Sequence, residues 1–168
     1  LLRENAHRLG IAGELRVLGR AEVVLLLREH LFELGLSRFA PLGDPTRFLG
    51  DVAGYISRAK EEAVTPDQID AFAAALRSKA AAVESDDNAT EKERSTNAEY
   101  AAALRRLGEE QAELAAVYRS YRSILAKRGL LDFGDQVLLS HELLQSDPLV
   151  AARVRERHRW LLVDEYQD

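Results

Sequence analysis

Apolar side chains recur at helical spacing between about Ala98 and Arg128, which predicts one long helix. The stripe consists of Tyr100, Leu104, Leu107, Leu114, Val117, Tyr118, Tyr121, Ile124 and Leu125. Gly129 follows the stripe and predicts the end of the helix, because glycine readily adopts the conformation that terminates helices. The tyrosines could stack on nucleic-acid bases, but at this spacing they are more typical of a core.

Further helices are predicted from their start signals. Asp44, Thr65 and Asp147 each precede a proline, so the side chain can accept a hydrogen bond from free N–H groups while proline occupies the first turn. Asp132 is predicted to start another helix, with Phe133 as its anchor in the core. A buried helix is also expected over residues 20–34. The pattern as a whole predicts a mainly α-helical chain.

The character of the sequence changes at Trp160-Leu161-Leu162-Val163, a short apolar run bounded by charged residues. Such a run is typical of a parallel strand that is buried on both faces. One strand cannot form a sheet, so its partners are expected outside this chain. An unpartnered strand would leave a sticky edge, and we expect it to pack on the helices or to pair with another copy of the chain.

Composition narrows the function classes. Hydrophobic residues make up 46% of the chain, which excludes wholesale disorder, and there is no cysteine for a disulfide or a thiolate site. No apolar run approaches the roughly 20 residues that cross a bilayer, so a cytoplasmic protein without membrane contact is expected. The chain contains no methionine and begins with Leu1, which we interpret as an interior position of a longer protein. A net charge of −5 argues against strong nonspecific DNA binding by this piece alone.

Two adjacent acids, Asp164 and Glu165, follow the apolar run directly. A carboxylate held rigidly at a strand end can bind Mg²⁺, which prefers hard oxygen ligands. A neighbouring carboxylate can polarise a water that attacks a phosphate. The arrangement therefore predicts the acidic half of a phosphate-hydrolysing site.

The string LLVDEYQD at residues 161–168 resembles motif II of superfamily 1 DNA helicases of the UvrD/Rep/PcrA type. Three further segments agree in order and spacing with that family. Leu131-Asp132-Phe133-Gly134-Asp135 resembles its LDFDD segment, Ile56-Ser57-Arg58-Ala59-Lys60 resembles its I-S-x-A-K segment, and Leu1-Leu2-Arg3-Glu4-Asn5 resembles the helix after its Thr-Phe-His segment. Gly134 stands where the family usually has Asp.

The resemblance implies a helical insertion subdomain, called 1B, within a RecA-like α/β motor, with one or two short strands. Residues 1–19 would be the edge of the first motor domain, residues 20–130 subdomain 1B, and residues 131–168 the return to the motor, ending in the motif II strand. The parent would be an ATP-dependent 3′–5′ DNA translocase that unwinds duplex in DNA repair or recombination, with single-stranded and duplex DNA as partners.

The resemblance also assigns site residues. Asp164 would organise Mg²⁺, Glu165 would act as the general base, and Gln167 would sense the γ-phosphate or its water. ATP and Mg²⁺ are expected in the full-length protein. No glycine in this chain is followed by lysine, so there is no GxxxxGK[ST] phosphate loop, and the piece alone is expected to bind no cofactor and to be inactive.

Arg58 and Lys60 are candidate DNA-binding residues because the resemblance places their segment near the DNA path. An equally good interpretation is a helix salt bridge with Glu61 and Glu62. A denser basic cluster over residues 153–159 is more simply a solvated helix end.

Two alternatives to a helicase of this type stay open. The chain could belong to the helicase part of a RecB-like helicase–nuclease, which a downstream nuclease domain would distinguish. It could also be a non-catalytic helical module that binds DNA or protein, in which case adjacent sequence would lack motor motifs.

Overall fold

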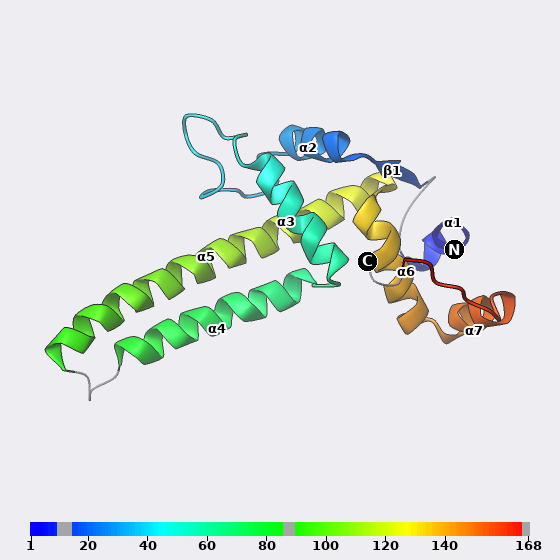
Figure 1. Ribbon diagram of the computed structural model, residues 1–168. Helices are drawn as coiled ribbons and strands as arrows, with labels where there is room; N and C mark the ends of the chain where they lie inside the picture. The colour runs from blue at the N-terminus through cyan, green and yellow to red at the C-terminus, as the bar shows by residue number, and fades with distance from the viewer. Residues whose placement is uncertain (10–14, 86–89, 166–168) are drawn as a thin grey trace.

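The computed structural model describes residues 1–9, 15–85 and 90–165, and the side chains of residues 91–93 are not described. The fold is mainly helical, as predicted, and its described residues also form one small parallel sheet (Figure 1). No helix within the described residues has the length and apolar character needed to cross a membrane.

The sheet pairs β1 (Arg16–Leu18) with β2 (Leu130–Asp132) in parallel. Val17 lies opposite Leu131 in the register. Parallel strands require a long crossover connection, which residues 19–129 supply here. The helices of this segment therefore form one insertion between two adjacent strands. Neither strand was predicted at these residues, because three residues are too few to display a strand period.

Two helices follow β1, and both are shorter than predicted. Helix α2 (Arg20–Glu29) ends five residues before the expected 34, and turns lead from it to Gly35, whose φ of 69° is readily accessible only to glycine. Helix α3 (Leu49–Glu61) begins at Leu49 and not at Pro45. The Asp44 carboxylate accepts hydrogen bonds from the backbone and hydroxyl of Thr46, so this signal starts a turn.

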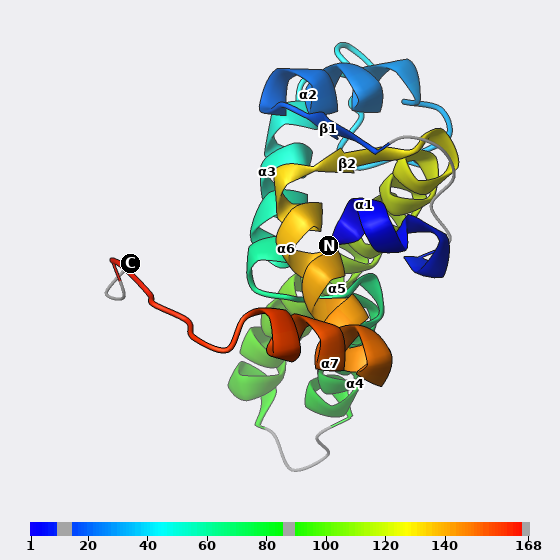
Figure 2. The ribbon, with the colours of Figure 1, turned by 90° about the vertical axis from the view of Figure 1, so that its right-hand side faces the viewer.

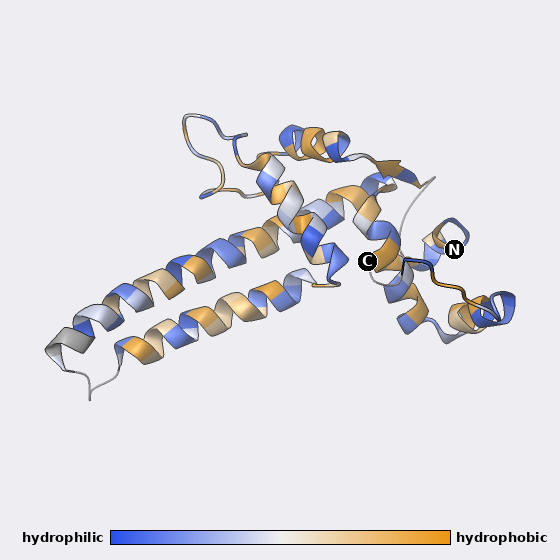
Figure 3. Ribbon diagram, viewed as in Figure 1, coloured by the Kyte–Doolittle hydropathy of each residue, from blue (hydrophilic) through white to orange (hydrophobic). Residues whose placement is uncertain are grey.

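Helices α4 (Pro66–Glu84) and α5 (Glu91–Arg128) form an antiparallel hairpin that extends from the body (Figure 1). The predicted helix start at Thr65 is confirmed, and it takes the form of a capping box: the Thr65 hydroxyl accepts from the backbone of Gln68, and the Gln68 side chain accepts from the backbone of Thr65. Helix α5 begins earlier than the expected Ala98. The hydropathy colouring alternates along both helices, as expected for two amphipathic helices that pack on each other (Figure 3).

The remaining helices are α1 (Leu2–Asn5), the 3₁₀ turn η1 (Ala6–Leu9), α6 (Phe133–Ser146) and α7 (Pro148–Arg157). Of these, α6 leads away from β2, and α7 packs at its far end, away from the sheet (Figure 2). Asp132 caps α6 and Asp147 caps α7, as predicted. Gly129, with a φ of 65°, ends α5 and allows the immediate turn into β2.

The main core gathers α2, α3, the start of α4 and the C-terminal half of α5. Tyr118 and Tyr121 are fully buried in it, which confirms the prediction for these two, whereas Tyr100 is 46% exposed. A smaller cluster of Ala80, Ala101 and Leu104 holds the hairpin together.

The run Trp160–Val163 is not a strand in this structure, contrary to the prediction. Its side chains are 91%, 83%, 97% and 60% exposed, and it does not pack on the helices. Figure 2 shows this segment leaving α7 and extending away from the body. A strand needs hydrogen-bonding neighbours, and β1 and β2 pair with each other instead.

Candidate functional site

The two acids of the motif end the exposed segment. The Oδ1 atom of Asp164 accepts a hydrogen bond of 2.9 Å from the backbone N–H of Glu165. Glu165 has a φ of 48°, a left-handed conformation that side-chain-bearing residues adopt uncommonly. Gln167 lies outside the described residues, so its expected role has no geometry here.

A magnesium site at Asp164 requires oxygen ligands that converge, and the described residues contain no cluster of three metal-ligating side chains. Carboxylate oxygen is nevertheless the ligand chemistry that Mg²⁺ prefers, and one or two carboxylates with several waters suffice when a nucleotide supplies phosphate oxygens. Asp164 would therefore hold the ion, and the ion would supply charge stabilisation at the phosphate.

Lys60 lies in the interior and not on a DNA-facing surface. Its side chain is 0% exposed, and its Nζ atom lies 2.6 Å from Asp132 Oδ2 and 2.6 Å from Asp135 Oδ1. The Tyr121 hydroxyl donates to the same Asp132 oxygen over 2.8 Å. A buried ammonium with two carboxylate partners cannot reach a phosphate in this conformation, so the geometry does not support Lys60 as a DNA contact.

Burial and the shared lysine act on the two carboxylates in different ways. Burial pushes the pKa of Asp132 upward, but the charge of Lys60 and hydrogen bonds from Lys60 and Tyr121 outweigh it and lower that pKa. Burial raises the pKa of Asp135, and the neighbouring Asp132 adds to the rise, so Lys60 does not compensate fully. Two acids that share one ammonium thus hold their protons with different strength.

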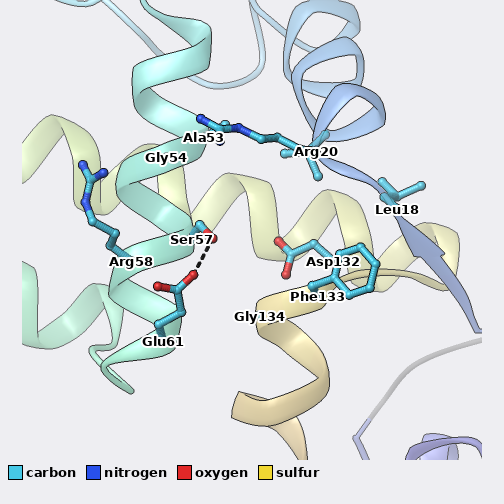
Figure 4. A pocket seen from close by; sticks show the side chains of 11 residues that line it. Leu18, Arg20, Ala53, Gly54, Ser57, Arg58, Glu61, Asp132, Phe133 and Gly134 are labelled. Atoms are coloured by element: carbon cyan, nitrogen blue, oxygen red, sulfur yellow. Dashed lines mark hydrogen bonds between the residues drawn. The ribbon is translucent and has the colours of Figure 1, made fainter. Parts of the chain in front are cut away.

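A groove of about 260 Å³ opens beside this buried cluster. Helix α3 supplies Gly54, Ser57 and Arg58, the start of α2 supplies Arg20, and the start of α6 supplies Phe133. Figure 4 shows Ser57 on α3 facing Asp132 at the start of α6, Arg20 reaching from the start of α2 toward α3, and Arg58 projecting from the side of α3 away from Phe133. Arg20 and Arg58 are exposed, and neither has an ion-pair partner within the described part of the chain.

Two acids also line the groove, but both are engaged. Glu61 accepts a hydrogen bond of 3.0 Å from Ser57, and Asp132 is held by Lys60 and Tyr121. The groove charges without an ion-pair partner among the described residues are therefore the two arginines and Glu61, whose carboxylate accepts only from a neutral hydroxyl.

Phe133 was expected in the core, and that expectation is wrong. Its side chain is 68% exposed at the rim of the groove. Lys60 occupies the inner side of the first turn of α6, where it lies against Gly134, so the ring is left outside. The signal available in the sequence was its position between a capping Asp and a glycine, which says nothing about the direction of the ring.

A family model for the UvrD/REP helicase N-terminal domain matches residues 1–168. The chain belongs to this family. The UvrD/REP assignment agrees with the predicted resemblance, and it covers both the acidic motif and the elements that form the groove.

Individual relatives of this UvrD/REP chain align over shorter segments. The chain is 41% identical over 58 residues to "ATP-dependent DNA helicase PcrA" of Leuconostoc citreum, covering 34% of this chain and 8% of that protein. It is 40% identical over 52 residues to "DNA helicase II" of Escherichia coli K12, covering 31% and 7%. It is 40% identical over 60 residues to "ATP-dependent DNA helicase UvrD2" of Mycobacterium tuberculosis H37Rv, covering 34% and 9%. The aligned segments thus span less than a tenth of these relatives, and no solved structure is significantly similar to the chain.

The structure separates the predicted site residues into two places. Arg58 lies in the groove and Lys60 behind it, both on α3. Asp164 and Glu165 lie on the extended segment beyond α7, and neither lines the groove.

Proposed function

We propose that the protein carrying this chain is an ATP-dependent DNA helicase that translocates 3′ to 5′ along single-stranded DNA and unwinds duplex, in DNA repair or recombination. The observation that carries the proposal is the family match over the whole chain together with the Asp164–Glu165 motif. The relatives are named as DNA helicases, and two of the printed names include ATP dependence. In this proposal the chain comprises subdomain 1B over residues 20–130 and parts of the first motor domain on either side.

The acidic motif Asp164–Glu165 is the proposed site of ATP hydrolysis in the helicase. Asp164 would hold Mg²⁺ and Glu165 would take the proton of the attacking water, while Gln167 would sense the γ-phosphate. The exposed run Trp160–Val163 would pair in the motor sheet, which would orient both acids on a rigid strand end. A phosphate loop of the GKT type must come from elsewhere in the protein, so the 168-residue chain alone should not turn over ATP.

The groove is the proposed contact for single-stranded DNA. Proteins that bind single strands combine cations that neutralise phosphates with aromatic rings on which bases stack. Arg20 and Arg58 are exposed and unpaired among the described side chains, and Phe133 offers its ring at the rim. Lys60 is not part of this contact.

The hydrolytic role is tested by Glu165→Gln in the protein carrying this chain, with Glu156→Gln on α7 as the matched control. Glu165→Gln should abolish DNA-stimulated ATP hydrolysis while nucleotide binding persists, because the amide cannot accept the proton. The control should hydrolyse ATP normally. Unchanged turnover by Glu165→Gln would refute the assignment.

The groove is tested by the affinity for a fluorescently labelled oligo-dT. One base–aromatic stack is worth about 1–3 kcal/mol, so Phe133→Ala should weaken binding by about 5- to 150-fold. Phe32→Ala is the matched control, because Phe32 is 98% exposed and does not line the groove. Equal affinities for the two variants would place the DNA contact elsewhere.

A further inference from the structure

Lys60 lies directly behind the groove and joins its two walls. One wall is α3, with Gly54, Ser57 and Arg58, and the other is the start of α6, with Asp132 and Phe133. Lys60 belongs to the first wall, and its ammonium contacts Asp132 and Asp135, which belong to the second.

The contact holds the backbone on both sides of Phe133. Asp132 accepts from the backbone of Asp135 over 2.9 Å, and Asp135 accepts from the backbone of Asp132 over 3.1 Å, which closes the first turn of α6. Lys60 binds both carboxylates of this capping box at once. The ring of Phe133 therefore projects from a turn whose two ends are tied to α3.

Gly134 makes the close approach of the two walls possible. A Cβ atom at this position would lie 3.0 Å from both Cβ and Cδ of Lys60. The stem of Lys60 packs where a side chain at 134 would project, so the spacing between α3 and α6 depends on both residues.

We infer that Lys60 is a positioning residue for single-stranded DNA: through the capping box of α6 it sets the position of Phe133 relative to Arg58 across the groove. The inference rests on the proposed DNA-binding role of the groove. Lys60 touches no DNA in this arrangement and acts only through the turn that carries the aromatic ring.

The test is a double-mutant cycle on oligo-dT affinity in the protein carrying this chain. Lys60→Met removes the ammonium and keeps the length of the side chain. If Lys60 acts through Phe133, Lys60→Met should weaken binding by most of the factor lost in Phe133→Ala. The double variant should then bind no more weakly than Phe133→Ala alone, because coupled residues give non-additive effects. Additive losses would overturn the inference.

Leu104→Ala is the control for a general loss of stability, because it removes core contacts in the α4–α5 hairpin far from the groove. It should lower the unfolding temperature without weakening DNA binding at low temperature.

If Lys60→Met does not fold, Gly134→Ala tests the same inference. Its added methyl group presses on the aliphatic part of Lys60 and pushes α3 and the start of α6 apart. Gly50→Ala on α3 is its matched control, since no atom lies within 4 Å of the added Cβ. Gly134→Ala should weaken oligo-dT binding several-fold and Gly50→Ala should not.

The outcomes also distinguish this inference from the proposed function. If Phe133→Ala leaves affinity unchanged, the groove is not the DNA contact. If Phe133→Ala weakens binding but Lys60→Met or Gly134→Ala binds like its control, only the positioning role of Lys60 falls.

Discussion

Removing the charge of Lys60 should strongly destabilise the chain itself. The side chains of Lys60, Asp132 and Asp135 are 0%, 14% and 5% exposed, so solvent cannot replace the lost partner. Breaking a buried ion pair by removing one member typically costs about 3–5 kcal/mol, and total stabilities are only about 5–15 kcal/mol. We therefore expect Lys60→Met to lower the free energy of unfolding by about 3–5 kcal/mol at pH 7.5.

Asp132 and Asp135 keep different numbers of hydrogen bonds when Lys60 is replaced by Met. Asp132 keeps hydrogen bonds from Tyr121 and from the backbone of Asp135, whereas Asp135 keeps only the one from the backbone of Asp132 among the described contacts. Burial already raises the pKa of Asp135 above its ordinary 3.8, and without Lys60 the pKa of both acids should rise further.

The stability lost in Lys60→Met should depend on pH. An acid whose folded pKa exceeds its unfolded value destabilises the fold while it is ionised, and the penalty disappears as pH falls through the folded pKa. The loss caused by Lys60→Met should therefore be larger at pH 7.5 than at pH 5.

Urea unfolding followed by circular dichroism at 222 nm measures the effect at both pH values. Tryptophan fluorescence would not report it, because Trp160 is 91% exposed in the folded chain. Lys79→Met, at an exposed lysine on α4, is the matched control and should change little. Unfolding curves of Lys60→Met that coincide with the unmodified chain, or a loss that is the same at both pH values, would refute the reasoning.

Three other side chains give predictions: replacing Tyr118 should not destabilise the fold, whereas replacing Tyr121 or Glu113 should. The buried hydroxyl of Tyr118 has no hydrogen-bond partner among the described residues, so Tyr118→Phe should leave the free energy of unfolding unchanged or raise it by about 1 kcal/mol. Tyr121→Phe loses the hydrogen bond to Asp132 and should lower the free energy of unfolding. If Tyr118→Phe is destabilised in thermal unfolding, the Tyr118 hydroxyl has a partner and the reasoning is wrong. Glu113 accepts from the backbone N–H groups of Ser37, Arg38 and Phe39; burial opposes ionisation, but these bonds and that of the Ser37 hydroxyl lower its pKa below the ordinary 4.5. Glu113→Gln should therefore lower the free energy of unfolding by about 1 kcal/mol at pH 7, a value already reduced for partial solvation. The difference in melting temperature between this variant and the unmodified chain should disappear as pH falls below 4.5, because Glu113 itself then becomes protonated. A difference that does not change with pH would contradict the assignment.

Local patterns predicted the features that depend on near neighbours in the chain. The caps at Thr65, Asp132 and Asp147 and the end of α5 at Gly129 all involve groups within a few residues of one another. Where the pattern misled, at Asp44, the same local chemistry served a turn instead of a helix.

The sequence by itself determined the family, through the acidic motif and its companion segments, and the mainly helical character, through apolar periodicity and caps. Only the tertiary structure decided that Lys60 points inward and Phe133 outward, and that β1 pairs with β2. The contact between Lys60 and Asp132 joins residues 72 positions apart, and no pattern over one or two helical turns reports such a distance. Whether a lysine serves a phosphate or a buried carboxylate depends on what the opposite element brings to it, and that is settled when the two helices pack.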